Sequence, residues 1–374
     1  MTFTFLHTAD WQIGKRFGAF DGDKPAVLRD QRLQAVDRLA QAATAGGCGA
    51  VLVAGDVFDA ETLSPSVSGQ LLARLKAHAA LTWHLLPGNH DPARAGGVWD
   101  GIAGDLPANV RAHLKSGASE IAPGVLLLSA PLASKRVSGD PTAFMDEVPS
   151  PEGVLRIGLA HGSVQGFGSA GEASVSIDPG RAKSARLDYL ALGDWHGTTR
   201  ISDRVWYSGT PEPDGFRDND PGNALIVHLG GGEAVRVERV PTGHFTWLRR
   251  EQRLDGAASL SLVEAEVQGL GGLAARTLMA LELSGSVSLA AFAQVEERLQ
   301  RLARHLFHLA ADTRRVTTYA DRSDLEALGS GALGDIAGRL RAAAEGGGEE
   351  AKVADRALRR LFFLARQTQA EGRP

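Results

Sequence analysis

Carboxylate, amide and imidazole side chains follow five short apolar stretches of this sequence, each at the point where the stretch ends. The five groups are Asp10-x-Gln12, Gly55-Asp56, Gly88-Asn89-His90-Asp91, His161 and Asp194-x-His196. Mixed oxygen and nitrogen ligands of this kind suit manganese, iron or zinc better than calcium. One carboxylate after a glycine, Asp56, is suited to bridge two divalent ions about 3.5–4 Å apart. The pattern therefore predicts a site for two divalent ions.

The stretches that precede these groups are predicted to be β-strands, and helical periodicity separates the first three of them. The predicted strands cover 2–6, 50–54, 81–86, 124–129, 155–160 and 189–192, and the predicted helices cover about 25–45 and 66–79. This alternation is typical of an α/β fold, in which helices cover a sheet. Because functional loops gather at the carboxyl ends of such strands, we expect the five groups to converge. Residues 163–179 and 203–222 are predicted to be loops.

The pattern changes near residue 230, where a second domain is predicted. Strands are expected over 233–240, 246–254 and 277–282, and an amphipathic helix over 289–305. Two helical segments follow, at about 323–344 and 349–369, separated by Gly346-Gly347-Gly348. We therefore predict a first domain over 1–230, a small α+β domain over 235–320 and a C-terminal helical segment over 321–374.

The composition argues against a disulfide-stabilised protein and against a membrane-spanning one. The chain has 374 residues, 43% of them hydrophobic and 22% charged, with a formal net charge of −4. It has one cysteine, Cys48, which rules out a disulfide framework. No apolar run approaches the length of a membrane span, and the N-terminus lacks the basic region of a signal peptide. We therefore expect a cytoplasmic protein without membrane contact.

The order and approximate spacing of the five groups resemble the calcineurin-like metallophosphoesterase superfamily, whose pattern is D-x-H, G-D, G-N-H-D/E, H and G-H-x-H. Four further words are similar to the SbcD branch, the nuclease subunits of double-strand-break repair complexes: His7-Thr8-Ala9-Asp10-Trp11, Gly55-Asp56-Val57-Phe58-Asp59, Ala191-Leu192-Gly193 and Tyr207-Ser208-Gly209-Thr210-Pro211. The resemblance implies a four-layer β-sandwich flanked by helices, with a small C-terminal α+β cap domain and terminal helices.

The resemblance also implies a role for each matching residue. The first ion would be surrounded by Asp10, Gln12, Asp56 and His196, and the second by Asp56, Asn89, His161 and Asp194. His90 would face the scissile phosphate, where it stabilises charge or protonates the leaving oxygen. Asp91 would orient His90 from behind. Asp59 would contact substrate or order its loop.

Two positions depart from the family pattern. Gln12 stands where the family has His, and Asp194 stands in place of the first His of G-H-x-H. A neutral amide oxygen is a weak ligand, so the first ion should be held less tightly. An added carboxylate favours a harder ion, so manganese is expected, with magnesium, iron and zinc as alternatives.

The resemblance implies a metal-dependent phosphodiesterase, a DNA exonuclease or endonuclease of the double-strand-break repair type. Its implied partners are DNA and an SbcC-like coiled-coil ATPase, to which the helix at 349–369 would dock; a homodimer is left open. Two alternatives remain open: a phosphoesterase acting on a smaller phosphate ester, and a DNA-binding scaffold subunit with a weakened metal site.

Overall fold

The chain divides into two compact units, described here by themselves. The computed structural model describes residues 2–167, 175–230, 234–319, 324 and 331–371. The first unit comprises residues 1–214 and 219–244, and the second comprises 215–218 and 245–374.

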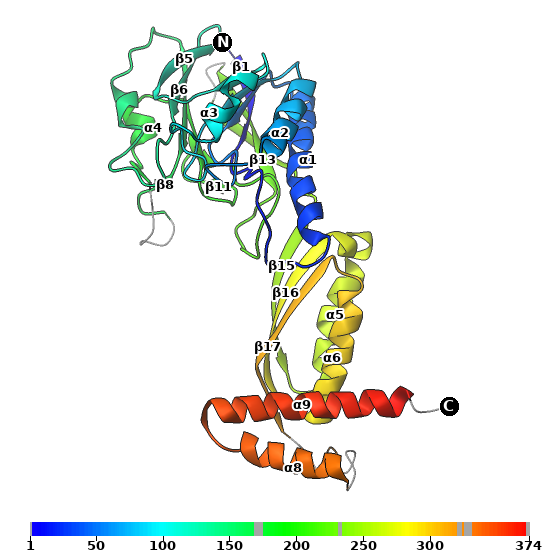
Figure 1. The fold of residues 1–374 in the computed structure, drawn as a ribbon. Helices are drawn as coiled ribbons and strands as arrows, with labels where there is room; N and C mark the ends of the chain where they lie inside the picture. The colour runs from blue at the N-terminus through cyan, green and yellow to red at the C-terminus, as the bar shows by residue number, and fades with distance from the viewer. Residues whose placement is uncertain (1, 168–174, 231–233, 320–323, 325–330, 372–374) are drawn as a thin grey trace. The chain divides into compact units, whose positions relative to one another are not determined.

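One sheet of the first unit carries the earliest strands of the chain. Its order is β14 (Arg236–Pro241), β13 (Asn223–Gly230), β1 (Thr2–Thr8), β2 (Ala50–Val53), β3 (Thr82–Leu85) and β4 (Val110–Ala112). The strands β1 to β4 are parallel, whereas β13 is antiparallel to both of its neighbours. Helices α1 (Lys24–Ala45) and α2 (Pro65–Ala77) cover one face of this sheet (Figure 1), where Leu39 and Leu75 are buried against Val51 and Trp83.

The second sheet of this unit carries the later strands. Its order is β11 (Thr199–Arg200), β12 (Val205–Tyr207), β10 (Tyr189–Gly193), β7 (Leu155–His161), β6 (Val125–Ala130) and β5 (Gly117–Ala122). The four central strands are parallel and both edge strands are antiparallel. Shorter elements complete the unit: α3 (Val98–Ile102), β8 (Ser163–Val164), β9 (Ser176–Ile177) and α4 (Arg181–Ser184).

The two sheets pack face to face. Phe5, Leu52 and Leu225 of the first sheet are buried against Ile157 and Tyr189 of the second. A further apolar cluster covers the outer face of the second sheet, so helices and loops flank a β-sandwich. This arrangement confirms the predicted fold class, because alternating apolar strands and amphipathic helices can bury their apolar faces only in such layers.

The second unit is built on three parallel strands, β15 (Thr246–Leu254), β16 (Thr277–Ser288) and β17 (His308–Tyr319). Helices α5 (Ser261–Gly269) and α6 (Leu289–Ala303) cover one face of this sheet (Figure 1) through a shared apolar core. Two further helices, α8 (Ala332–Ala344) and α9 (Gly348–Glu371), pack together with α6 around Leu289, Ala337 and Phe362. In the part of the chain that the structure describes, no helix is long and apolar enough to cross a bilayer.

Several stretches differ from their sequence-based predictions, among them the predicted loop at 163–179, which contains β8 and β9, and strand β13, which no prediction covers. The predicted strand at 233–240 forms β14, which pairs with β13 in the first unit and does not begin the second. The predicted loop at 203–222 contains β12 and the Gly215–Asp218 segment of the second unit. Strand β17 was not predicted, because its polar, half-exposed residues lack apolar alternation. Part of the predicted helix at 323–344 lies outside the described residues.

Candidate metal centre

The backbone at the strand ends is strained where the predicted ligands lie. Asp10, Gln12, Asp56 and Asp194 have φ values of 54°, 44°, 51° and 102°, in the left-handed region. Residues other than glycine adopt this conformation at a cost in free energy, and such strain clusters at functional sites. The tight turns aim these side chains back across the ends of β1, β2 and β10.

Two glycines make room for this close approach. A Cβ atom on Gly55 would lie 2.1 Å from Nδ1 of His161, and a Cβ on Gly88 would lie 2.1 Å from Oδ1 of Asp56. Both positions therefore require the absence of a side chain. The Gly-Asp and Gly-Asn words of the sequence thus have a steric basis in the site.

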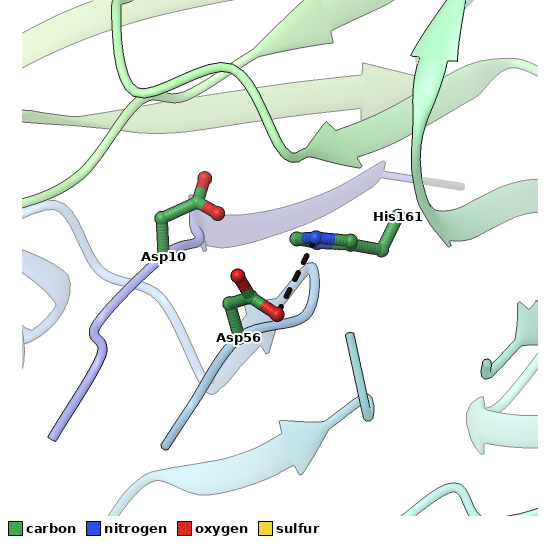
Figure 2. A group of neighbouring side chains, drawn as sticks. All are labelled: Asp10, Asp56 and His161. Atoms are coloured by element: carbon green, nitrogen blue, oxygen red, sulfur yellow. Dashed lines mark ion pairs between the residues drawn. The ribbon is translucent and has the colours of Figure 1, made fainter. Parts of the chain in front are cut away.

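Asp10, Asp56 and His161 come together from three different strand ends, as Figure 2 shows. Each offers a ligand atom, and these atoms lie within 4.8 Å of one another. All three side chains are buried. Burial raises the pKa of Asp10 to about 6, although His196 and His161 oppose that change. Two buried carboxylates this close together need a positively charged group or ion beside them.

Three side-chain oxygens lie near Nε2 of His161. Its Nε2 lies 2.8 Å from Oδ1 of Asn89, 3.5 Å from Oδ1 of Asp56 and 3.9 Å from Oδ1 of Asp194. Its Nδ1 donates to the backbone oxygen of Ala54 at 2.8 Å, so a neutral ring would aim its Nε2 lone pair at those oxygens. That arrangement needs a proton or a metal cation at Nε2.

The electrostatics of His161 agree with this need. Burial lowers its pKa, but the carboxylates of Asp56, Asp10 and Asp194 outweigh burial and raise it to about 9. A divalent ion among the same oxygens would replace that proton, because a metal-ligating imidazole is neutral. The donor set of Asp10, Asp56, Asn89, His161 and Asp194 therefore fits a divalent ion.

The other two predicted ligands lie in a separate hydrogen-bonded ring. Nε2 of Gln12 lies 3.2 Å from Nε2 of His196, and Nδ1 of His196 lies 3.1 Å from Oδ1 of Asp214. Lys15 closes the ring, with its Nζ 2.8 Å from Oε1 of Gln12 and 2.6 Å from Oδ2 of Asp214. Gln12 and His196 are buried, the side chain of Asp214 is 7% exposed, and Lys15 is half-buried.

Asp214 and Arg32 were not identified from the sequence. Asp214 lies three residues beyond the Tyr207–Pro211 word, within a predicted loop, and that proximity was its only signal. Arg32 is buried on α1 and donates to the backbone oxygens of Asp10, Trp11 and Glu212. It therefore ties the first motif loop to the loop that precedes Asp214.

His90 lies at the open side of the site. Its backbone N–H donates to Oδ1 of Asp56 at 2.9 Å, and its side chain is 43% exposed with Nε2 3.9 Å from Oδ2 of Asp56. Its Nδ1 lies 3.0 Å from the backbone oxygen of Asp59. Nδ1 is therefore engaged by the main chain, whereas Nε2 lies toward Asp56.

Asp91 has different partners from those that the resemblance implies. Its carboxylate accepts hydrogen bonds from the backbone N–H groups of Gly88 at 2.7 Å and Phe58 at 3.0 Å, and it is completely buried. The imidazole of His90 is instead held by Asp59. Asp91 therefore joins the two motif loops, because its two oxygens satisfy donors on both of them.

Residues 3–164 match the family model described as calcineurin-like phosphoesterase. The match supports the metallophosphoesterase superfamily and implies metal-dependent hydrolysis of phosphate esters. No curated protein matches the sequence.

Two solved structures have low sequence identity and low structural similarity to the chain. One is TT1561 of Thermus thermophilus, at 12% identity and a TM-score of 0.40, covering 65% of this chain and 100% of that one. The other is GAP50, the anchor in the inner membrane complex of Plasmodium, at 12% identity and a TM-score of 0.41, covering 64% of this chain and 85% of that one. At these scores neither structure bears on function.

Proposed function

We propose that this protein is a metal-dependent phosphodiesterase that cleaves DNA. The observation that carries the hydrolytic part is the convergence of Asp10, Asp56 and His161 on one buried point. A divalent ion bound there supplies Lewis acidity toward a phosphoryl oxygen and lowers the pKa of water. Manganese is the ion that we expect, because carboxylate and amide oxygens outnumber imidazoles.

The charge of the site favours a diester over a monoester. The described site carries many carboxylates and few cations; the carboxylates belong to Asp10, Asp56, Asp59, Asp194 and Asp214. A phosphodiester has a single negative charge, whereas a monoester near neutral pH approaches two. The acidic surroundings therefore repel a diester less strongly.

His90 is the residue that we propose to contact the reacting phosphate. The bond to Asp59 fixes the ring, so its Nε2 is the atom that can hold a proton and pass it to the leaving oxygen. Its exposed side chain is the part of the site that an incoming strand can reach.

The proposal of DNA as substrate rests on the SbcD-like words and on cations beside the motif loops. Arg94 lies 2.8 Å and Lys135 3.9 Å from the carboxylate of Glu61, and both basic side chains are more than half exposed. Glu61 and Arg94 follow Asp59 and Asp91 closely in the chain. Such cations bind backbone phosphates with release of counterions. Arg181 is not counted here because it is buried beside Asp140, and Arg249 and Arg250 belong to the second unit.

We also propose that α8 and α9 contact a coiled-coil ATPase. Apolar side chains remain exposed on both helices, namely Leu333, Ile336, Val353 and Leu364. A chain truncated at Gly346 should lose the partner in a pull-down assay. Unchanged binding by the truncated chain would exclude α9 from the contact.

One assay panel tests the enzymatic proposal. Linear DNA, hairpin DNA, a chromogenic bis-phosphodiester and the matching monoester would be offered with Mn²⁺, Mg²⁺ or Zn²⁺. We expect the protein to cleave DNA and the diester, and Asp56→Ala and His90→Ala to lose both activities. The variant His305→Ala, at an exposed histidine of the second unit, serves as the control.

The alternatives predict other outcomes. Hydrolysis of a small ester without DNA cleavage would replace the nuclease with a smaller-substrate phosphoesterase. DNA binding without hydrolysis of any substrate would favour the scaffold function. DNA cleavage by Asp56→Ala at the wild-type rate would exclude the metal centre as its source.

A further inference from the structure

We infer that this protein holds one tightly bound divalent ion, at the Asp10–Asp56–His161 centre. We also infer that Lys15 prevents a second ion from binding at Gln12 and His196. The inference rests on the proposed function, since both assign this centre to a divalent ion. It departs from the two-ion expectation because Gln12 and His196, two of the residues that would hold the first ion, lie in the hydrogen-bonded ring with Lys15 and Asp214.

The lysine decides the orientation of the amide. An ammonium group only donates hydrogen bonds, so the Gln12 atom 2.8 Å from Nζ of Lys15 is the carbonyl oxygen. The amide NH₂ of Gln12 therefore faces Nε2 of His196 and donates to it at 3.2 Å. Oε1 of Gln12 and Nε2 of His196, the atoms that these two residues could offer to a first ion, are thus engaged within the protein.

The histidine and the carboxylate complete the same pattern. Because Nε2 of His196 accepts from the amide, its Nδ1 carries the proton and donates to Oδ1 of Asp214 at 3.1 Å. The other oxygen of Asp214 accepts from Lys15 at 2.6 Å. Donors and acceptors alternate around the ring, and each side-chain group in it has a partner.

A second divalent ion would have to break this ring. It would need the oxygen that Lys15 holds and the nitrogen that the Gln12 amide holds. It would also lie close to an ammonium group in a largely buried place, where like charges repel strongly. At the His161 centre the reverse applies, because Nε2 faces three oxygens and needs a cation.

Lys15 is therefore a positioning residue that supplies a fixed positive charge on the side of Gln12 and His196. Removing its charge should open the ring. Lys15→Met keeps most of the apolar stem, Lys15→Gln keeps polarity without charge, and Lys15→Arg keeps the charge. Lys115→Ala, at an exposed lysine, controls for the loss of a lysine elsewhere.

The test counts metal ions in the 374-residue chain. Each variant would be stripped with a chelator, reloaded with Mn²⁺ and desalted, and bound manganese measured by mass spectrometry and by electron paramagnetic resonance. We expect one ion per chain with an uncoupled Mn²⁺ spectrum in the wild type, Lys15→Arg and Lys115→Ala. We expect two ions per chain with a spin-coupled spectrum in Lys15→Met and Lys15→Gln.

The outcomes separate this inference from the function that it rests on. Two ions in the wild type would overturn the inference and leave the phosphodiesterase proposal standing. One ion in the wild type and in both uncharged variants would overturn the role of Lys15. No bound ion in the folded wild type would overturn both proposals. Circular dichroism identifies any variant that does not fold. If a variant is lost in this way, the number of ions in the wild type still decides the stoichiometry.

Discussion

Nδ1 of His90 lies 3.0 Å from the backbone oxygen of Asp59 but 4.0 Å from the Oδ1 of its carboxylate. The main chain therefore orients this imidazole, and the carboxylate adds only a longer electrostatic contact. Burial raises the pKa of the Asp59 carboxyl, and Lys15 and His90 oppose that change.

This relationship separates the roles of the two residues. His90→Ala should lower kcat about 10²- to 10⁴-fold, the usual contribution of a general acid. Asp59→Ala should cost no more than about tenfold, because the carbonyl that holds His90 remains. Steady-state kinetics on a bis-phosphodiester measures both. An equal loss in the two variants would show that the Asp59 carboxylate itself acts on the substrate.

Gly55 and Gly47 form a matched pair for testing the steric basis of the site. Both have positive φ, +91° and +68°, but an added Cβ meets His161 only at Gly55 and meets nothing within 4 Å at Gly47. Gly47→Ala should cost about 1–2 kcal/mol in the free energy of unfolding, from its backbone conformation alone. Gly55→Ala should cost more and should also lower bound manganese. Urea unfolding and metal analysis of both variants test this; equal losses would contradict the clash.

Asp91 should contribute to stability more than to chemistry. Asp91→Asn replaces one acceptor oxygen with an NH₂ group facing a backbone N–H of Gly88 or Phe58. A buried donor left without an acceptor costs about 1–3 kcal/mol, so the unfolding midpoint in urea should fall. Asp100→Asn is the control, because Asp100 is exposed and accepts from Gly96 at 2.8 Å. A loss of turnover at unchanged stability would instead place Asp91 in the chemistry.

His84 and His113 predict a dependence of stability on pH. Nδ1 of His84 lies 3.0 Å from Nε2 of His113, a bond that requires a neutral acceptor ring. Burial lowers the pKa of His84 to about 3, with His113 and Arg111 adding to the effect, and burial lowers that of His113 to about 4.

Between those values and the ordinary pKa of about 6.5, the unfolded chain binds more protons than the folded one. The free energy of unfolding that the neutral pair contributes is therefore fully present above about pH 6.5. As the pH is lowered below that value, this free energy decreases by about 1.4 kcal/mol per pH unit for each proton. The double variant His84→Leu, His113→Leu should flatten this slope between about pH 6.5 and 4.5 in urea titrations. His305→Gln, at an exposed histidine, should leave it unchanged. An unaltered slope in the double variant would show that the pair does not titrate on unfolding.

Local pattern was sufficient to predict much of the first unit. The strands that became β1, β2, β3, β7 and β10, and helices α1 and α2, follow from apolar alternation and helical periodicity. The convergence of Asp56, Asn89 and His161 could be predicted because each residue comes at or just after the carboxyl end of a strand, and parallel strands bring these ends to one edge of a sheet. Strands β2 and β10 are buried on both faces, which makes them continuous apolar runs that are easy to recognise.

The sequence by itself determined which side chains are available to bind metal, because the Gly-Asp and Gly-Asn-His-Asp words occur within a few residues of strand ends. Only the tertiary structure decided how they are partnered. Gln12 meets His196 across 184 residues, and Lys15 meets Asp214 across 199. Contacts of that separation depend on the register and packing of two sheets, which no local spacing encodes. The ring that engages Gln12, and the attachment of Asp91 to the backbone and not to His90, therefore became visible only in the folded chain.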